Sequence, residues 1–215
     1  MNIMKILDAV KKAKSYHEPW THHVITDVLT DNQIKEIQNA EIVRDGIIHD
    51  GTRSGYIEGV EKQNHSLREY ITKENCHKYP YLTQLIKDLQ TPDVRRAISE
   101  LIKRDDDFEG AYVRLEVLRD TKSFWLKPHV DIPEKLISSL IYINQTDEDA
   151  NLGTDLYDKD GKLSKTIPFE HNLGYIFTGD DTLHGVEEGK KIKVDRRGIQ
   201  LNYVTFETDW PAMQL

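Results

Sequence analysis

Apolar residues in the first hundred positions recur with the spacing of amphipathic helices. Four stretches place them on one helical face, and these stretches begin near Ile3, Thr30, Leu85 and Thr91. Thr30 with Gln33 three residues later has the pattern of a capping box, and Thr91 precedes a proline suited to the first helical position. A short strand is expected over residues 23–28, whereas residues 44–65 lack a clear period and indicate a loop with short strands. The N-terminal half is therefore expected to be mostly helical.

From Gly110 onward the period falls to two, which is typical of strands. Apolar and polar side chains alternate from Ala111 to Val117, and seven further segments of strand character follow, separated by turn residues: 124–131, 136–144, 154–157, 166–169, 174–178, 184–187 and 198–206. Many short strands after a helical part favour a sandwich or jelly roll with helices packed on one side. The chain shows no repeat or linker. We therefore predict a single domain over 1–215, with a supporting region at 1–109, a strand-rich core at 110–206 and a tail at 207–215.

Charge and cysteine content narrow the classes of partner. The chain has 215 residues, with 29 Lys and Arg against 37 Asp and Glu, and a formal net charge of −8. An acidic chain binds phosphate backbones and anionic lipid poorly, so neither nucleic acid nor a membrane is expected as a partner. The single cysteine, Cys76, cannot form an internal disulfide, and the first twenty residues lack the apolar core of a secretory signal. We expect a soluble, cytoplasmic protein whose oligomeric state the sequence does not fix.

Candidate chemistry lies in the strand-rich half. His129 and Asp131 are two residues apart, on the same face of a predicted strand, where an imidazole and a carboxylate can share a metal. The dyad alone carries little weight, since roughly one or two H-x-[DE] matches are expected by chance in such a chain. His184 follows 55 residues later, on another predicted strand. Two histidines and one carboxylate form the facial triad of non-haem Fe(II) oxygenases, which leaves three positions on the metal open.

Two adjacent arginines precede the last predicted strand. Arg197 shares a face with the apolar residues Ile199, Leu201 and Tyr203. Arg196 shares the opposite, polar face with Gly198, Gln200 and Asn202. A guanidinium on the polar face beside a metal site is suited to bind a carboxylate through two hydrogen bonds. We therefore favour Arg196 over Arg197 as a carboxylate clamp, with a solvated edge strand as the alternative.

Together these features resemble the 2-oxoglutarate/Fe(II)-dependent oxygenase superfamily, and within it the prolyl-hydroxylase-like branch. The resemblance covers residues 110–206, about half of the chain. It is carried by Trp125–Asp131, by Leu140–Asn144 (similar to the family's "YLN" strand), by Gly153–Tyr157 (similar to its "GGxLxLY" segment), by Gly174–Val186 and by Arg196–Tyr203. It implies a mainly β fold with α-helices, in which N-terminal helices flank a double-stranded β-helix (a cupin-like jelly roll).

The resemblance also implies roles for single residues. His129, Asp131 and His184 would be the catalytic ligands of Fe(II), and Arg196 would bind the far carboxylate of the cosubstrate 2-oxoglutarate. Tyr142 matches a tyrosine whose hydroxyl helps to bind that carboxylate, although a core aromatic would look the same. Gly198 stands where many members have serine, so one hydroxyl contact would be absent.

The implied reaction consumes O2 and 2-oxoglutarate, releases succinate and CO2, and hydroxylates a small molecule or peptide that the sequence does not identify. Candidate substrate contacts are Tyr112, Arg114, Glu116, Lys135 and a lid-like loop at 44–65. Two alternatives remain, namely a cupin-like metalloenzyme that needs no 2-oxoglutarate and a non-enzymatic jelly-roll binding or structural protein. Arg196 argues against the first, and the triad argues against the second.

Overall fold

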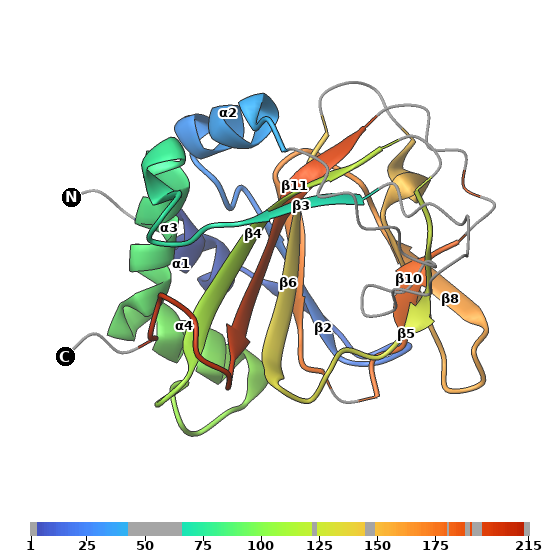
Figure 1. The fold of residues 1–215 in the computed structure, drawn as a ribbon. Helices are drawn as coiled ribbons and strands as arrows, with labels where there is room; N and C mark the ends of the chain where they lie inside the picture. The colour runs from blue at the N-terminus through green and yellow to red at the C-terminus, as the bar shows by residue number, and fades with distance from the viewer. Residues whose placement is uncertain are drawn as a thin grey trace.

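The computed structural model describes residues 4–42, 66–121, 124–144, 149–179, 181–187, 190 and 195–212. In these residues two antiparallel sheets pack face to face, and the α-helices lie on the outer side of the larger sheet (Figure 1). The elements in chain order are α1 (Lys5–Lys11), β1 (Lys14–Tyr16), β2 (His22–Thr26), α2 (Asp31–Asn39), β3 (Ser66–Tyr70), the 3-10 helix η1 (Cys76–Lys78), α3 (Pro80–Gln90), α4 (Pro92–Ile102), β4 (Tyr112–Asp120), β5 (Leu126–His129), β6 (Lys135–Ile143), the 3-10 helix η2 (Ala150–Leu152), β7 (Thr154–Tyr157), β8 (Leu163–Ile167), β9 (Leu173–Phe177), β10 (His184–Val186) and β11 (Arg196–Val204).

The sheet topology is that of a jelly roll. The larger sheet has the order β1-β2-β9-β6-β11-β4-β3, and the smaller sheet has the order β5-β10-β7-β8. From β4 onward the chain passes back and forth between the two sheets, so strands that are neighbours in space are distant in sequence. The fold is therefore mainly β with helices, as the sequence predicts.

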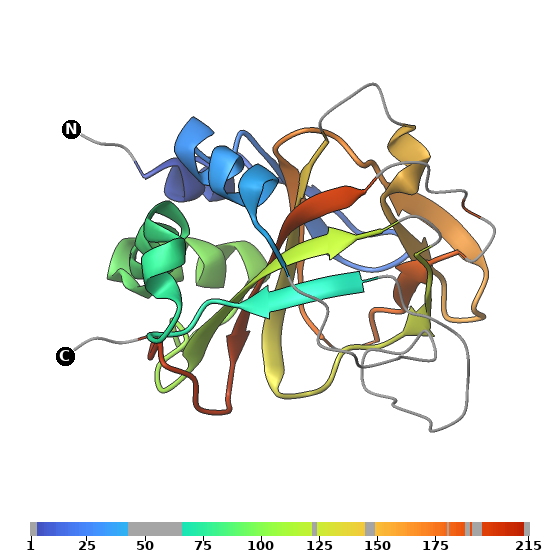
Figure 2. The same ribbon diagram turned by 45° about the horizontal axis from the view of Figure 1, so that its top comes forward.

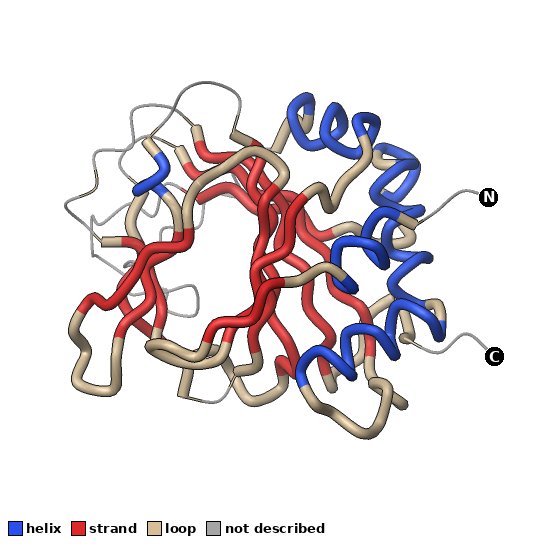
Figure 3. The backbone as a smooth tube through the Cα atoms, turned by 180° about the vertical axis from the view of Figure 1, so that it is seen from behind, coloured by secondary structure: helices blue, strands red, loops and turns tan. Residues whose placement is uncertain are grey.

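Each face of the larger sheet has its own core. The helices lie along the outer face (Figure 3), and apolar side chains of β4, β6 and β11 pack against them. On the inner face, aromatic and aliphatic side chains of both sheets meet: Phe124, Leu126, Tyr142, Leu156, Ile167, Phe169, Tyr175 and Phe177. Figure 2 shows the same layers from another angle, with the helices on one side of the larger sheet and the smaller sheet on the other. A cavity between the two sheets is lined by several buried polar side chains, among them Asp120, His184 and Arg196.

The helix starts predicted at Thr30 and Thr91 are found where the sequence places them, whereas α3 begins at Pro80, five residues before the expected Leu85. Thr30 caps α2, since its Oγ1 accepts from Gln33 N at 3.3 Å while Gln33 Oε1 accepts from Thr30 N at 2.8 Å. Thr91 occupies the N-cap position of α4 before Pro92 but makes no capping bond. Its hydroxyl donates instead to Asp88 O at 2.6 Å, so it closes the end of α3.

The strands predicted after residue 110 are present, but some of them begin at other residues than predicted. Of these eight strands, β8 begins three residues earlier than predicted and β11 two residues earlier. The sequence analysis missed β1 and β3, and the loop predicted at 44–65 lies outside the described residues. No helix in the described parts of the chain is long and apolar enough to cross a membrane.

The capping box of α2 gives a prediction for stability. Replacing Thr30 by alanine removes the acceptor for Gln33 N, and we expect the free energy of unfolding to fall by about 1 kcal/mol. Thr30→Ser keeps the hydroxyl and is expected to stay close to the wild type. Urea denaturation followed by circular dichroism measures both, and equal losses in the two variants would exclude the cap as the cause.

Candidate functional site

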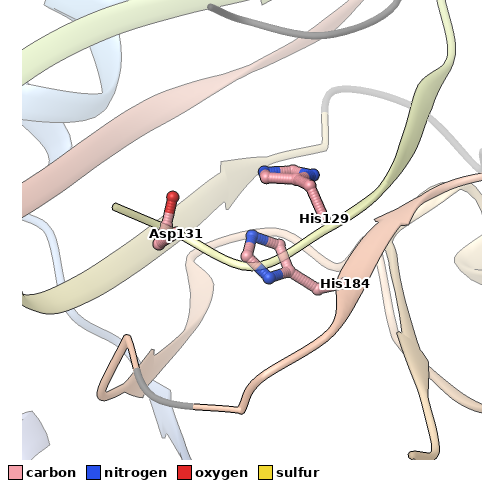
Figure 4. A group of neighbouring side chains, drawn as sticks. All are labelled: His129, Asp131 and His184. Atoms are coloured by element: carbon pink, nitrogen blue, oxygen red, sulfur yellow. The ribbon is translucent and has the colours of Figure 1, made fainter. Parts of the chain in front are cut away.

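Two histidines and one aspartate, residue types that can bind a metal, meet between the sheets. His129 ends β5 and His184 begins β10, and the antiparallel pairing of these strands places the two histidines opposite each other. Their ring centroids are 4.4 Å apart. One ligand atom from each of His129, Asp131 and His184 lies within 4.8 Å of the other two, and the three side chains point toward a common centre (Figure 4). The geometry therefore brings together the three residues that the sequence analysis singled out.

Asp131 is positioned differently from what the sequence analysis predicted. The sequence analysis placed it on the same strand as His129, but β5 ends at His129 and Asp131 lies beyond it. Lys135 Nζ and Ser138 Oγ, both from β6, donate hydrogen bonds to its two carboxylate oxygens. Asn202 Nδ2 in turn donates to Ser138 Oγ at 2.9 Å. The position of Asp131 is thus set by side chains of the larger sheet.

Both histidines present their Nε2 atoms to the centre. His129 Nδ1 lies 2.9 Å from Lys127 O, and His184 Nδ1 lies 2.7 Å from Thr182 O. A carbonyl oxygen can only accept, so each Nδ1 carries the proton and each Nε2 keeps a lone pair. This is the arrangement in which histidine binds a metal, because the partner of Nδ1 fixes both the tautomer and the ring orientation.

The protonation states also suit a metal. Burial raises the pKa of Asp131, but the charge of Lys135 and its hydrogen bond outweigh that effect and hold this pKa well below its usual range. Burial, followed by the neighbouring His129, lowers the pKa of His184 to about 4. At neutral pH the centre therefore combines an ionised carboxylate with a neutral imidazole, as metal ligands require.

A narrow cavity of about 40 Å³ connects the two histidines to Arg196. Arg196 begins β11 and is 1% exposed. Its guanidinium carbon lies 5.5–5.7 Å from the ring centroids of three aromatic residues, Phe124, Tyr142 and Phe169. Its Nε and Nη1 donate no hydrogen bond to any residue that the structure describes. A buried cation with unused donors is costly unless an anion binds to it, so this end of the cavity is suited to a carboxylate.

Arg197 faces away from the cavity. Its Nη1 donates to Ile37 O and Ala40 O at 3.3 Å each, at the C-terminal end of α2. The strand alternation therefore separates the two arginines as the sequence pattern predicts, with Arg196 inside and Arg197 against the helices.

The structure also shows the contacts of Tyr142 and Gly198, the two other residues that the sequence analysis discussed. Tyr142 is fully buried, and its hydroxyl shares a hydrogen bond with Thr154 Oγ1, which lines the cavity. A Cβ atom at Gly198 would lie 2.2 Å from Ile141 O of the adjacent strand. No serine fits at this position without a backbone shift, which explains why the chain departs here from the pattern Arg-x-Ser.

Among the cavity-lining residues that sequence reasoning missed are Arg68, Asp120 and Tyr175. Asp120 shares a strand face with Arg114 and Glu116, and the alternation could have placed it inside. Arg68 lies on β3, which gave no strand signal. Of the suggested substrate contacts, Glu116 is fully buried and Lys135 binds Asp131, while Arg114 stacks on the ring of Tyr70.

The neutral, buried His184 predicts a pH dependence of stability in the metal-free protein. Its pKa is about 4 when folded and about 6.5 when unfolded, so the unfolded state binds more protons between these values and stability falls as the pH falls through this window. We expect the His184→Gln variant to lose about 2 kcal/mol less than the wild type between pH 7 and pH 4.5. Urea denaturation at both pH values measures this, and an equal loss in both proteins would contradict a buried neutral ring. Protonation of Asp131 lowers the stability only at a lower pH, because the pKa of this carboxyl is depressed in the folded protein.

No protein-family model matches the chain, and no curated protein matches it in sequence. Solved structures match it in fold. A prolyl 4-hydroxylase from Phytophthora capsici has a TM-score of 0.62 and 12% identity, covering 96% of this chain and 66% of that chain. A prolyl hydroxylase from Trichoplax adhaerens, in complex with a peptide fragment of the hypoxia inducible factor oxygen degradation domain, has a TM-score of 0.58 and 18% identity, covering 86% and 83%.

A third structure, from Caulobacter crescentus and named as a 2OG-Fe(II) oxygenase family protein, has a TM-score of 0.53 and 14% identity, covering 93% of this chain and 80% of that chain. Identities this low establish the fold and leave the activity to be argued from the site. The chain therefore has the jelly-roll fold that prolyl hydroxylases and related 2OG-Fe(II) oxygenases share.

Proposed function

We propose that this protein is an Fe(II)- and 2-oxoglutarate-dependent oxygenase that hydroxylates a small-molecule or peptide substrate. One observation carries the proposal: His129 and His184, which form a group with Asp131, line the same cavity as the buried Arg196 guanidinium. When bound, iron and 2-oxoglutarate would supply the oxidation of an unactivated C–H bond by O2, with release of succinate and CO2.

The triad would hold the iron. Two imidazole nitrogens and one carboxylate on one side of an ion are the donor set of non-haem Fe(II) oxygenases, and they leave positions open for other ligands. The carbonyl oxygens of Lys127 and Thr182 keep both Nε2 atoms turned to the ion. Lys135 and Ser138 hold the carboxylate of Asp131 in place and ionised. The protein thus fixes the donor geometry before the metal arrives.

Arg196 would bind the far carboxylate of 2-oxoglutarate, whose keto-acid end would face the metal. The rings of Phe124, Tyr142 and Phe169 surround the guanidinium, exclude water and so strengthen its attraction for an anion. Tyr142 is proposed to support this end through its hydroxyl, which reaches Thr154 at the cavity wall. Because the cavity is narrow, side chains along it must move apart to admit the cosubstrate.

The two alternatives predict other behaviour. A cupin-like metalloenzyme that works without 2-oxoglutarate has no use for a buried guanidinium with unused donors at the end of the cavity. A non-enzymatic jelly roll has no use for two buried or half-buried imidazoles whose Nε2 atoms converge with a carboxylate. Both features are present together here, which favours the oxygenase.

The decisive experiment follows the chelation of 2-oxoglutarate to bound iron. The protein is loaded with Fe(II) without oxygen and titrated with 2-oxoglutarate, while the weak visible band of an iron–keto-acid chelate is recorded. We expect a band in the wild type, none in His184→Ala, and in Arg196→Ala a 2-oxoglutarate dissociation constant that is higher by roughly 30-fold or more, since a buried charge loses its partner.

Arg197→Ala is the matched control, because it removes the adjacent arginine on the opposite face of β11. Its band and dissociation constant are expected to equal those of the wild type. Iron binding without a band would favour the cupin-like alternative, and no iron binding would favour a binding protein. A loss in Arg197→Ala equal to that in Arg196→Ala would show that neither arginine acts as a specific clamp.

A further inference from the structure

Asp120 lies between two arginines at one end of the cavity. Its carboxylate is 3.1 Å from Arg68 Nη2 and 3.7 Å from Arg196 Nη1. The first distance is that of a hydrogen-bonded ion pair, whereas the second is too long for a hydrogen bond. The side chains of Asp120 and Arg196 are 2% and 1% exposed, and that of Arg68 is 17% exposed. All three residues line the cavity that contains His129 and His184.

A carboxylate in this place competes with any ligand carboxylate for Arg196. If Asp120 and Arg196 were alone, they would form a neutral buried pair, and the donors of Arg196 would be taken. Arg68 changes this balance among the described residues, because two guanidiniums and one carboxylate carry a net charge of +1. The shorter contact ties Asp120 to Arg68, and Arg196 is left with two donors that no described residue uses. One further carboxylate would bring the group to neutrality.

We propose that Arg68 is a positioning residue of the cosubstrate site: it holds Asp120 away from Arg196, so that Arg196 can bind the far carboxylate of 2-oxoglutarate. This inference rests on the proposed function. It assigns to Asp120 the role of a counter-ion for Arg68, and it makes β3, at the edge of the larger sheet, part of the cosubstrate site. Arg68 acts through Asp120 and does not need to touch the cosubstrate.

Calorimetric titration of 2-oxoglutarate into the Fe(II)-loaded full chain, without oxygen, tests this role by binding alone. In Arg68→Gln, Asp120 has only Arg196 as a cation partner within the group, so the dissociation constant is expected to rise roughly tenfold or more. In Asp120→Asn the competing carboxylate is gone, and the dissociation constant is expected to be equal to or lower than that of the wild type. The double variant restores the net charge of +1 and is expected to bind within about threefold of the wild type, which a double-mutant cycle records as strong coupling.

Arg119→Gln is the matched control, since Arg119 precedes Asp120 on β4 but pairs with Asp195. It removes the same charge and is expected to leave the dissociation constant unchanged. Circular dichroism checks that each variant is folded. If one single variant does not fold, the other still decides, because the proposal fixes the direction of each change separately.

The outcomes separate this inference from the proposed function. If the wild type does not bind 2-oxoglutarate, the proposed function fails and the inference fails with it. If the wild type binds it and Arg196→Ala does not, but Arg68→Gln binds as tightly as the wild type, only the inference is overturned. Weaker binding in Asp120→Asn, or a double variant as weak as Arg68→Gln, would also overturn it, since either result means direct support of the ligand by the residue removed.

Discussion

The alternation of side chains along β11 is the constraint on which both the core and the cavity depend. This strand lies between β6 and β4 near the middle of the larger sheet. Ile199, Leu201 and Tyr203 project to the helices, while Arg196 and Gln200 project to the cavity. A shift by one residue would bury Arg197 in place of Arg196 and turn the apolar side chains inward. Packing against the helices therefore fixes the position of the buried cation as well.

The candidate metal centre joins the two sheets. His129 and His184 come from paired strands of the smaller sheet, so their separation is set by backbone hydrogen bonds. Asp131 follows β5 but is held by Lys135 and Ser138, which belong to the larger sheet. The three ligands can meet only when the sheets are packed correctly, and each ligand has a polar partner that orients it. A centre of this kind is preorganised by the fold rather than by a flexible loop.

How much the sequence predicts depends on how local each feature is. The capping box at Thr30 and the alternation before and within β11 involve neighbours in the chain, and they could be recognised directly. The three residues of the candidate metal centre could be found because two of them form a short motif. Arg68 could not be found in this way: β3 has the sequence Ser-Leu-Arg-Glu-Tyr, and it becomes a strand by pairing with β4, some fifty residues later. The position of Gly198 likewise becomes meaningful only when the carbonyl of Ile141 on the next strand is known.

The charges inside the cavity follow a simple pattern. A carboxylate is paired with a cation near each end: Asp131 with Lys135 beside the two histidines, and Asp120 with Arg68 at the other end. Arg196 is the additional cation at the second end, and the residues described there leave it without a hydrogen-bonding acceptor of its own for Nε and Nη1. The cavity thus has two histidines of the candidate metal group at one end and a guanidinium with unused donors at the other. A keto acid with a second carboxylate would suit both ends at once, whereas a monocarboxylic keto acid would leave Nε and Nη1 of Arg196 without a hydrogen-bonding acceptor. Under the proposed function, the burial of Arg196 would therefore favour a cosubstrate with a second carboxylate.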